Sequence, residues 1–276
     1  MTPSDGPLSD PDTTPFGTYR PKGFAHALLW IVRLGLARGT LSRQLRRFWN
    51  SRLPTTVDIE RRGIRYRLNV RDNVTDAKIL LSSKVYDREE LEHLANACDD
   101  GTFIDIGANT GYYSLHVAAA GARQVLAIEP NPPTFRRLLF NLECNRFAEA
   151  IQALPLAIGP NGTAMLHLAE GLGSASLNPS EQSRGNTVEV QTEPLLDVLT
   201  NAGIERIDGL KIDIEGYEYQ ALEPFFRDAA PSLHPRCIVI ESCHGHIWEK
   251  DVLALLREHG YQIQSRSRSN SILYLS

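Results

Sequence analysis

The sequence is poor in cysteine, has no long hydrophobic run, and lacks acidic side chains over one N-terminal stretch. Its cysteines form no CxxC pair and no Cys/His spacing of the zinc type; they are Cys98, Cys144, Cys237 and Cys243. This argues against a disulfide framework, and we expect reduced thiols. The group Cys243, His244 and His246 offers three ligands on one short segment, which is weak support for a metal, and we predict none.

The expected cellular location follows from two features that the sequence is predicted to lack, a membrane span and a leader. The apolar run Ala27–Val32 is too short to cross a bilayer, and Arg33 ends it. The acidic N-terminal residues and the lack of a small-residue cleavage site argue against a signal peptide. We therefore expect a cytoplasmic protein.

Charge is distributed unevenly along the chain. None of the 33 acidic residues lies between Thr13 and Val57, although that stretch carries eight of the 29 basic ones: Arg20, Lys22, Arg33, Arg38, Arg43, Arg46, Arg47 and Arg52. From Asp58 onward, 30 acidic residues outnumber 21 basic ones. The pattern is that of a basic arm on an acidic domain. Because the larger part is acidic, we expect no nucleic-acid partner.

Three segments are expected along the chain. Residues 1–22 are rich in Pro, Thr, Ser, Asp and Gly and are predicted to be disordered. Residues 23–56 form a basic amphipathic helical arm, which Gly35 and Gly39 divide into two helices. Its apolar positions at helical spacing are Phe24, Leu28, Ile31, Leu41, Leu45 and Phe48. Residues 57–276 form the main folded domain.

The arm has two interpretations. Its apolar stripe can dock on the domain while the arginines face water, which is the common case for amphipathic helices and the one we favour. Alternatively, residues 24–52 contact an anionic membrane surface or a partner protein.

The main domain is predicted to be α/β. Alternating residues over 56–59 and 64–70 indicate a β-hairpin, and residues 89–97 a helix. Strands at 102–106, 124–129, 151–157, 209–214 and 237–241 alternate with helices at 133–145, 217–226 and 248–259. Such alternation predicts a mostly parallel sheet with helices on both faces. Residues 261–265 and 271–275 indicate a closing antiparallel hairpin, and 160–195 an inserted hairpin near the carboxyl ends of the strands.

The clearest motif follows the first of these parallel strands. Asp105-Ile106-Gly107-Ala108-Asn109-Thr110-Gly111 has the spacing DxGxxxG, in which a strand runs through a glycine turn into a helix. Gly107 allows the sharp turn, and Gly111 allows close approach of the helix start to a ligand. A dinucleotide motif, GxGxxG, would have glycine at Asn109 for the pyrophosphate. The loop therefore favours a sulfonium nucleoside, which has no phosphate.

Two further strand ends fit a nucleoside cofactor. Glu129, at the end of the second parallel strand, can accept hydrogen bonds from both ribose hydroxyls. The apolar residues Leu154–Ala157 at the third strand end suit an adenine face. The alternative is an α/β domain whose loop binds nothing.

An acidic group marks the fourth strand end. Asp213, Glu215 and Glu218 lie where a strand gives way to a helix. Acids there can simply cap the helix or favour its macrodipole. Asp213, however, sits in an otherwise apolar strand, where burying a carboxylate is costly without a purpose. At the fifth strand end, His244 is a candidate general base, with a solvated loop histidine as the alternative.

With these motifs the sequence resembles the FkbM-type family of S-adenosylmethionine-dependent methyltransferases. The matching stretches are residues 103–114, 128–131, 141–145 and 210–218, with weaker matches at 195–199 and 240–244. The resemblance runs from about Tyr86 to the C-terminus and does not include residues 1–57. Where the family often has an aromatic–Glu pair before the first strand, this chain has Tyr86-Asp87.

The resemblance implies a Rossmann-like seven-stranded methyltransferase sheet and O-methylation of a hydroxyl on a sugar, glycan or natural product. It implies cofactor contacts at Asp105, Gly107, Asn109, Gly111, Glu129 and Asn131, to which we add the neighbouring Ala108 and Tyr112 and the strand-end Ala157. Asp213, Glu215 and Glu218 would border the acceptor. We predict Asp213, His244 and Glu218 as catalytic residues. The alternatives are a nicotinamide-dependent oxidoreductase and a non-catalytic binding protein that uses the basic arm.

Overall fold

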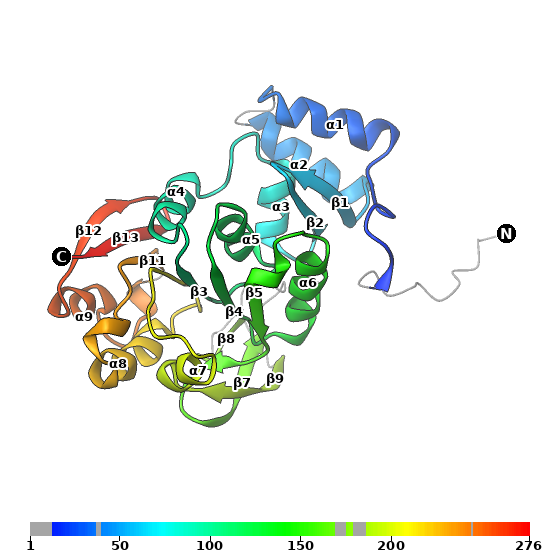
Figure 1. Cartoon of the computed structure of the whole chain (residues 1–276). Coiled ribbons are helices and arrows are strands. Elements are labelled where there is room, and N and C mark those ends of the chain that lie inside the picture. The colour runs from blue at the N-terminus through cyan, green and yellow to red at the C-terminus, as the bar shows by residue number, and fades with distance from the viewer. Residues whose placement is uncertain (1–12, 37–39, 169–174, 179–185, 244) are drawn as a thin grey trace.

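A seven-stranded sheet forms the centre of the protein (Figure 1). The computed structural model describes residues 13–36, 40–168, 175–178, 186–243 and 245–276. The strands are ordered β12-β13-β11-β10-β3-β4-β5. Their bounds are β3 (Thr102–Ile106), β4 (Gln124–Ile128), β5 (Ile151–Leu154), β10 (Gly209–Ile212), β11 (Cys237–Glu241), β12 (Tyr261–Arg266) and β13 (Asn270–Leu275). Within this sheet β13 pairs antiparallel with both neighbours and the other pairs are parallel, which confirms the predicted fold class.

Helices cover both faces of this sheet because successive strand side chains point to opposite sides. Phe103, Val125 and Val239 face a core shared with α4 (Arg88–Ala97), α5 (Tyr112–Ala119) and α6 (Pro132–Glu143). Ile104 and Leu126, on the same strands, face a second core shared with α7 (Leu195–Asn201), α8 (Glu218–Asp228) and α9 (Val252–Glu258). Short 3-10 turns lie at Ala148–Ala150, Pro231–Leu233 and Gly245–Ile247. Near-continuous apolar strands are thus buried on both sides, as a parallel sheet requires.

The hairpin predicted before the main sheet is present and carries a helix that the pattern did not show. β1 (Thr56–Arg61) pairs antiparallel with β2 (Ile64–Asn69), and α3 (Val74–Leu81) follows. The Asn73 side chain caps α3 by accepting hydrogen bonds from the backbone of Thr75 and Asp76. Because α3 is short and weakly amphipathic, periodicity could not reveal it.

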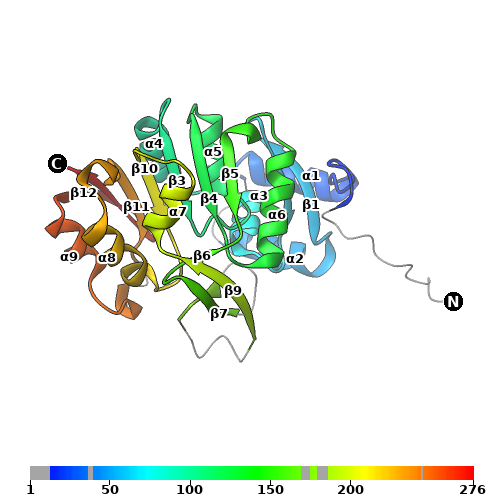
Figure 2. The same cartoon turned by 60° about the horizontal axis from the view of Figure 1, so that its bottom comes forward.

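A second, four-stranded sheet projects beyond the carboxyl ends of the main strands (Figure 2). Its order is β6-β9-β7-β8, with β6 (Ala157–Ile158), β7 (Gly162–Leu168), β8 (Ala175–Ser176) and β9 (Thr187–Glu193). The antiparallel pair β7–β9 confirms the predicted inserted hairpin. The strand predicted over 151–157, in contrast, is two strands. Pro155 has no N–H for the ladder, so β5 ends at Leu154 and Ala157 pairs with β9 instead.

The basic arm forms α1 (Gly23–Arg33) and α2 (Thr40–Arg52), which lie at one end of the molecule (Figure 1). Leu28 and Trp49 are buried against the domain, so one apolar stripe docks as expected. The predicted stripe is only partly correct. Leu28 and Leu45 pack against the core, whereas the other four members are exposed: Phe24, Ile31, Leu41 and Phe48. Almost every position of α1 is apolar, so spacing alone could not choose the buried face. Across the described ranges, no helix is long and apolar enough to cross a membrane.

The segment predicted to be disordered, residues 1–22, needs correction over residues 13–22. Arg67 and Asp58 form a buried ion pair with 2.7 Å between nitrogen and oxygen. Arg67 also donates to the carbonyls of Thr14 and Pro15, and the backbone N–H of Tyr19 donates to Asp58. These contacts order a segment whose composition is that of a loop. Residues 1–12 lie outside the described residues.

Candidate active site

A cavity lies at the carboxyl ends of four parallel strands. Its volume is about 980 Å³, including the part that is open to solvent. The chain continues from β3 to β4 and β5 on one side and returns to β10 on the other, so the strand order reverses between β3 and β10. Open α/β sheets bind ligands at such a switch point. Residues at the ends of four strands meet there: Gly107, Glu129 and Asp213 follow β3, β4 and β10, and Glu241 is the last residue of β11.

The glycine loop satisfies its own backbone N–H groups. Gly107 and Ala108 donate to the carbonyl of Ile128, Asn109 to the Glu129 carboxylate, Thr110 to the Asn109 side chain and Gly111 to the carbonyl of Ala108. None of these five groups is left for a phosphate, and the adjacent Glu129 would repel one. The loop geometry thus agrees with the spacing argument against a dinucleotide.

Gly107 lies where a side chain cannot fit. Its φ is +78°, and a Cβ there would collide with the backbone carbonyl oxygen of Asp213. The Lys211 ammonium donates to the carbonyl of Gly107 at 3.2 Å and holds the loop against β10. The loop that follows β3 and the acid that follows β10 are therefore in direct backbone contact. A shift of one moves the other.

Glu129 is fixed from two sides. One carboxylate oxygen accepts the N–H of Asn109 and the other the N–H of Asn131, both at 2.9 Å. Each oxygen keeps lone-pair capacity, and the residue lines the cavity. Burial raises the pKa of Glu129 to about 7. A carboxylate held this way can accept two hydroxyl hydrogen bonds, as a ribose diol requires.

We expect Glu129→Gln to weaken binding of S-adenosylhomocysteine about 10- to 100-fold, because hydrogen bonds to a charged group contribute about 1.5–3 kcal/mol. The amide also places an NH₂ group against a backbone donor. Titration calorimetry measures the change, with Glu143→Gln on the exposed face of α6 as the matched control. Equal affinity in both variants would show that Glu129 does not contact the ligand.

The nine predicted cofactor residues separate into two sets. Those that line the cavity are Gly107, Ala108, Asn109, Tyr112, Glu129 and Ala157. Asp105, Gly111 and Asn131 do not line it. The Asp105 carboxylate is buried and accepts the backbone N–H and the hydroxyl of Ser114, and Asn131 supports Glu129. In this structure these three residues support the loop and Glu129, and their contact with a cofactor stays a prediction.

The hairpin helix α3 supports the same loop. The Asn73 amide donates to the Asn109 side chain at 2.6 Å, and the Thr110 hydroxyl donates to the buried Asp76 carboxylate at 2.8 Å. The residue Thr75 itself lines the cavity. Sequence spacing missed these contacts because they join segments more than 30 residues apart.

The Tyr86-Asp87 pair also reaches the site. Both residues line the cavity, and the hydroxyls of Tyr112 and Tyr113 donate to the Tyr86 carbonyl and the Asp87 carboxylate, each at 2.7 Å. Of the five non-glycine residues with positive φ in the described ranges, three border the cavity: Asp87, Asn109 and Glu215. Such strained backbone gathers at functional sites.

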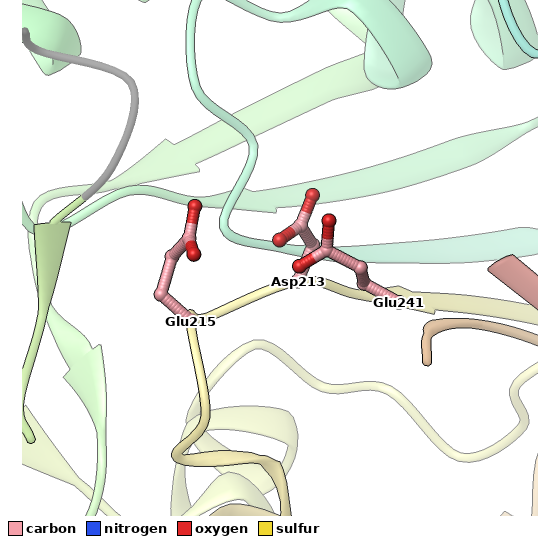
Figure 3. Close-up of side chains that lie close together, drawn as sticks. All are labelled: Asp213, Glu215 and Glu241. Carbon is pink, nitrogen blue, oxygen red and sulfur yellow. The ribbon is translucent and has the colours of Figure 1, made fainter. Parts of the chain in front are cut away.

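Three carboxylates meet at the ends of β10 and β11. Asp213, Glu215 and Glu241 each offer an oxygen within 4.8 Å of the others, and Figure 3 shows all three directed to the same side of the strand ends. The Lys211 ammonium is buried and lies 3.4 Å from the Asp213 carboxylate. The sequence prediction named Asp213 and Glu215 but missed Glu241. Glu241 lies at a strand end, as Glu129 does, and this position in the sequence could have identified it.

The charges of this group are set by burial and proximity. Burial first, and then the Asp213 carboxylate, raise the pKa of Glu241 to about 9, so Glu241 carries a proton at neutral pH. Burial lowers the pKa of Lys211, but the carboxylates of Asp213 and Asp105 outweigh it and raise the pKa above its ordinary value. The cavity therefore presents the Asp213 carboxyl group between the Lys211 ammonium and a neutral carboxylic acid.

We expect the free energy of unfolding to fall by about 2 kcal/mol between about pH 7 and pH 8.5. The folded protein keeps on Glu241 a proton that the unfolded chain, whose glutamates titrate near pH 4.3, has already lost. Stability is thus lost as pH rises toward the folded pKa. Denaturant unfolding at several pH values measures the slope, which Glu241→Gln should flatten. An unchanged slope in this variant would contradict the assignment.

The three carboxylates could also hold a divalent cation, because magnesium and calcium prefer oxygen ligands. Two features oppose this. Lys211 already supplies a positive charge beside Asp213, and Glu241 retains a proton that a cation would have to displace. The expectation that no metal is bound stays a prediction.

Two predicted catalytic residues are placed differently from Asp213. Glu218 does not line the cavity; its buried carboxylate accepts the N–H of Ile214 at 2.9 Å and the indole N–H of Trp248 at 2.7 Å. It holds the loop after β10, and its predicted catalytic role stays a prediction. His244 lies outside the described residues, and its role as a base stays a prediction.

Comparisons with known proteins agree with this geometry. The family model described as Methyltransferase FkbM domain matches residues 105–263. The hexuronic acid methyltransferase AglP of Haloferax volcanii is 30% identical over 173 residues, covering 60% of this chain and 65% of that protein, just under two thirds of its length. The methyltransferase sdnD of Sordaria araneosa is 28% identical over 201 residues, covering 62% of this chain and 77% of that protein.

A third relative carries the family name. The 31-O-demethyl-FK506 methyltransferase FkbM of Streptomyces tacrolimicus is 26% identical over 221 residues, covering 69% of this chain and 84% of that protein. The family match overturns the alternative of a nicotinamide-dependent oxidoreductase, which the paired loop N–H groups also disfavour. The chain belongs to the FkbM family of methyltransferases, and its cofactor is S-adenosylmethionine.

Proposed function

We propose that this methyltransferase acts on a hydroxyl group of a sugar, glycan or other natural product, with Asp213 as the general base. The observation that carries the proposal is the position of Asp213. It follows β10 at the switch point, lines the cavity, touches the glycine loop through its backbone and is paired with buried Lys211.

The residues fit the cofactor on one wall of the cavity. Glu129 would accept hydrogen bonds from the ribose hydroxyls, and Leu156, Ala157 and Ile158 would flank the adenine. S-adenosylmethionine supplies a methyl group already activated on a sulfonium. The protein therefore contributes mainly orientation, for which correct placement of two reactants can supply several kcal/mol.

Asp213 is suited to take the proton of an acceptor hydroxyl. Its carboxyl group is paired with the Lys211 ammonium, and Glu241, neutral at pH 7, adds no competing negative charge. A carboxylate in hydrogen-bond reach of the acceptor removes the proton as the oxygen attacks. Glu218 keeps the loop that follows Asp213 in place through Ile214. The base and the glycine loop are held in one rigid arrangement.

The names of the relatives support this acceptor class. One is named a hexuronic acid methyltransferase and another a 31-O-demethyl-FK506 methyltransferase, so the first name points to a sugar acid and the second to methylation of an oxygen. Leu166, Ala175 and Leu177, from the inserted sheet, line the cavity and are proposed to select among such acceptors.

An acceptor screen with a labelled methyl donor tests the proposal. The panel contains sugar, polyketide, lipid and protein hydroxyls, nucleic acids, and an amine analogue of each small acceptor. Label is expected in a hydroxyl compound and not in its amine analogue. Label in nucleic acid alone would overturn both the proposed acceptor and the expectation that no nucleic acid is bound. Label in amines alone would overturn the oxygen specificity.

We expect removal of divalent metal to leave turnover unchanged, because the Lys211 ammonium rather than a metal ion pairs with Asp213. Dialysis against a chelator, followed by assay with and without magnesium, measures this. Activity that is lost on dialysis and restored by magnesium would assign the three carboxylates to a metal.

A further inference from the structure

Helix α1 is apolar on two opposite faces. Ala25, Leu28, Leu29 and Val32 are buried against the domain. On the other side, residues 24, 27, 31 and 34 follow one another at helical spacing and form an exposed stripe. Phe24 is 64% exposed, Trp30 56% and Leu34 60%. A helix that is apolar all round is normally buried all round, yet the part of the chain that the structure describes leaves this second face exposed.

The exposed face continues onto α2. The rings of Phe24 and Phe48 meet edge to face with centroids 5.8 Å apart, which joins the two helices. We call the combined patch the apolar arm surface; its residues are Phe24, Trp30, Ile31, Leu34, Leu36, Leu41 and Phe48, each at least 39% exposed. Single exposed apolar residues are ordinary, but seven of them on two helices joined by a ring contact, and on the turn after α1, indicate an interaction site.

Charge identifies the kind of partner. The exposed side chains on and around the apolar arm surface include Arg20, Lys22, Arg33, Arg47 and Arg52. No acidic residue lies between Thr13 and Val57, whereas the rest of the chain from Asp58 carries an acidic excess. Basic residues beside exposed Trp, Phe and Leu are the composition of a helix that lies in an anionic membrane interface.

Within the described residues no side chain covers the apolar arm surface, whose members stay at least 39% exposed. In Figure 1, α1 lies at the outer edge of the molecule, at the end opposite to β7 and β9. A flat surface can therefore approach α1 without meeting the inserted sheet.

We propose that α1 and α2 bind the surface of an anionic lipid bilayer. The apolar arm surface enters the headgroup region, and the flanking arginines and lysine contact lipid phosphates. The helices lie on the membrane, since neither is long enough to span it. The proposal does not depend on which acceptor is methylated.

Co-sedimentation of the full chain with lipid vesicles tests this. Vesicles of phosphatidylcholine alone are compared with vesicles that contain about 30% phosphatidylglycerol, and we expect about tenfold or greater preference for the anionic ones, reduced by salt. The double variant Ile31→Glu, Leu34→Glu should lose at least about tenfold in binding, because it adds charge to the inserted face. The matched control is Met165→Glu on β7, a residue 48% exposed and away from the arm, which should bind like the wild type.

Tryptophan fluorescence gives a second readout. Trp30 is exposed on the proposed face, whereas Trp49 is buried. Quenching by brominated lipid should be strong in the wild type and weak in Trp30→Phe, although this variant still sediments with vesicles. Absence of vesicle binding, or equal binding of the double variant, would overturn the proposal. A dimer in light scattering that the double variant converts to a monomer would assign the surface to a second copy of the chain and overturn it as well.

Discussion

We expect Asp213→Asn to lower kcat by about 10²- to 10⁴-fold, the usual contribution of a positioned general base. Asparagine keeps the shape of the side chain but cannot take a proton. The cavity wall formed by the glycine loop and Glu129 is unaffected, so cofactor affinity should stay close to that of the wild type. Steady-state kinetics and calorimetry with S-adenosylhomocysteine separate the two effects.

Glu215→Gln is the matched control for this variant. Glu215 lines the same cavity and belongs to the same group of carboxylates, but Lys211 pairs with Asp213. We expect a much smaller loss of kcat in the control, with both variants folded by thermal unfolding. Full turnover in Asp213→Asn, with cofactor saturated, would remove Asp213 from the chemistry. His244 would then become the next residue to test.

Gly107→Ala is expected to have the second large effect, a loss of about 10²-fold or more in kcat/KM. The added methyl group would collide with the carbonyl oxygen of Asp213, so the loop or β10 must move. Either movement displaces the cofactor wall from the base. We also expect a decrease of at least about 2 kcal/mol in the free energy of unfolding, as for overpacked sites.

Gly63→Ala is the control that separates the effect of the Cβ collision at Gly107 from the effect of placing alanine at a positive φ. Gly63, in the turn between β1 and β2, has φ +80°, close to that of Gly107, but has nothing within 4 Å of the added Cβ. It should lose about 1 kcal/mol of stability and no activity. If the two variants behaved alike in activity, the contact between Gly107 and Asp213 would not be important.

The sequence pattern predicts the fold and the place of the cavity well, because both depend on strand ends. In a parallel sheet the residue after each strand lies at one edge, so the sequence alone is enough to group Gly107, Glu129 and Asp213. The same rule applied to β11 would have included Glu241. Glu241 escaped the prediction because the histidines that follow it are the more familiar bases at neutral pH.

Spacing could not decide which side chains face the cavity. Asp105 and Glu218 are near strand ends, yet both point to backbone and side-chain donors within the protein. A sequence motif includes every residue that the site needs. It does not distinguish residues that contact the ligand from residues that hold the contacting residues in place. The hydrogen bond from Thr110 to Asp76 was unpredictable for another reason. Asp76 lies in α3, the helix that follows the β1–β2 hairpin, outside the main sheet.

The most direct test of Asp213 as the base is the fate of a ¹³C-labelled methyl group from S-adenosylmethionine, followed by NMR of the product formed by the wild type and by Asp213→Asn. We predict a methyl resonance bonded to oxygen in the wild-type product and its near absence with the variant. A methyl group bonded to nitrogen or carbon, or equal yields from the two proteins, would contradict the assignment of Asp213 as the base of an O-methyltransferase.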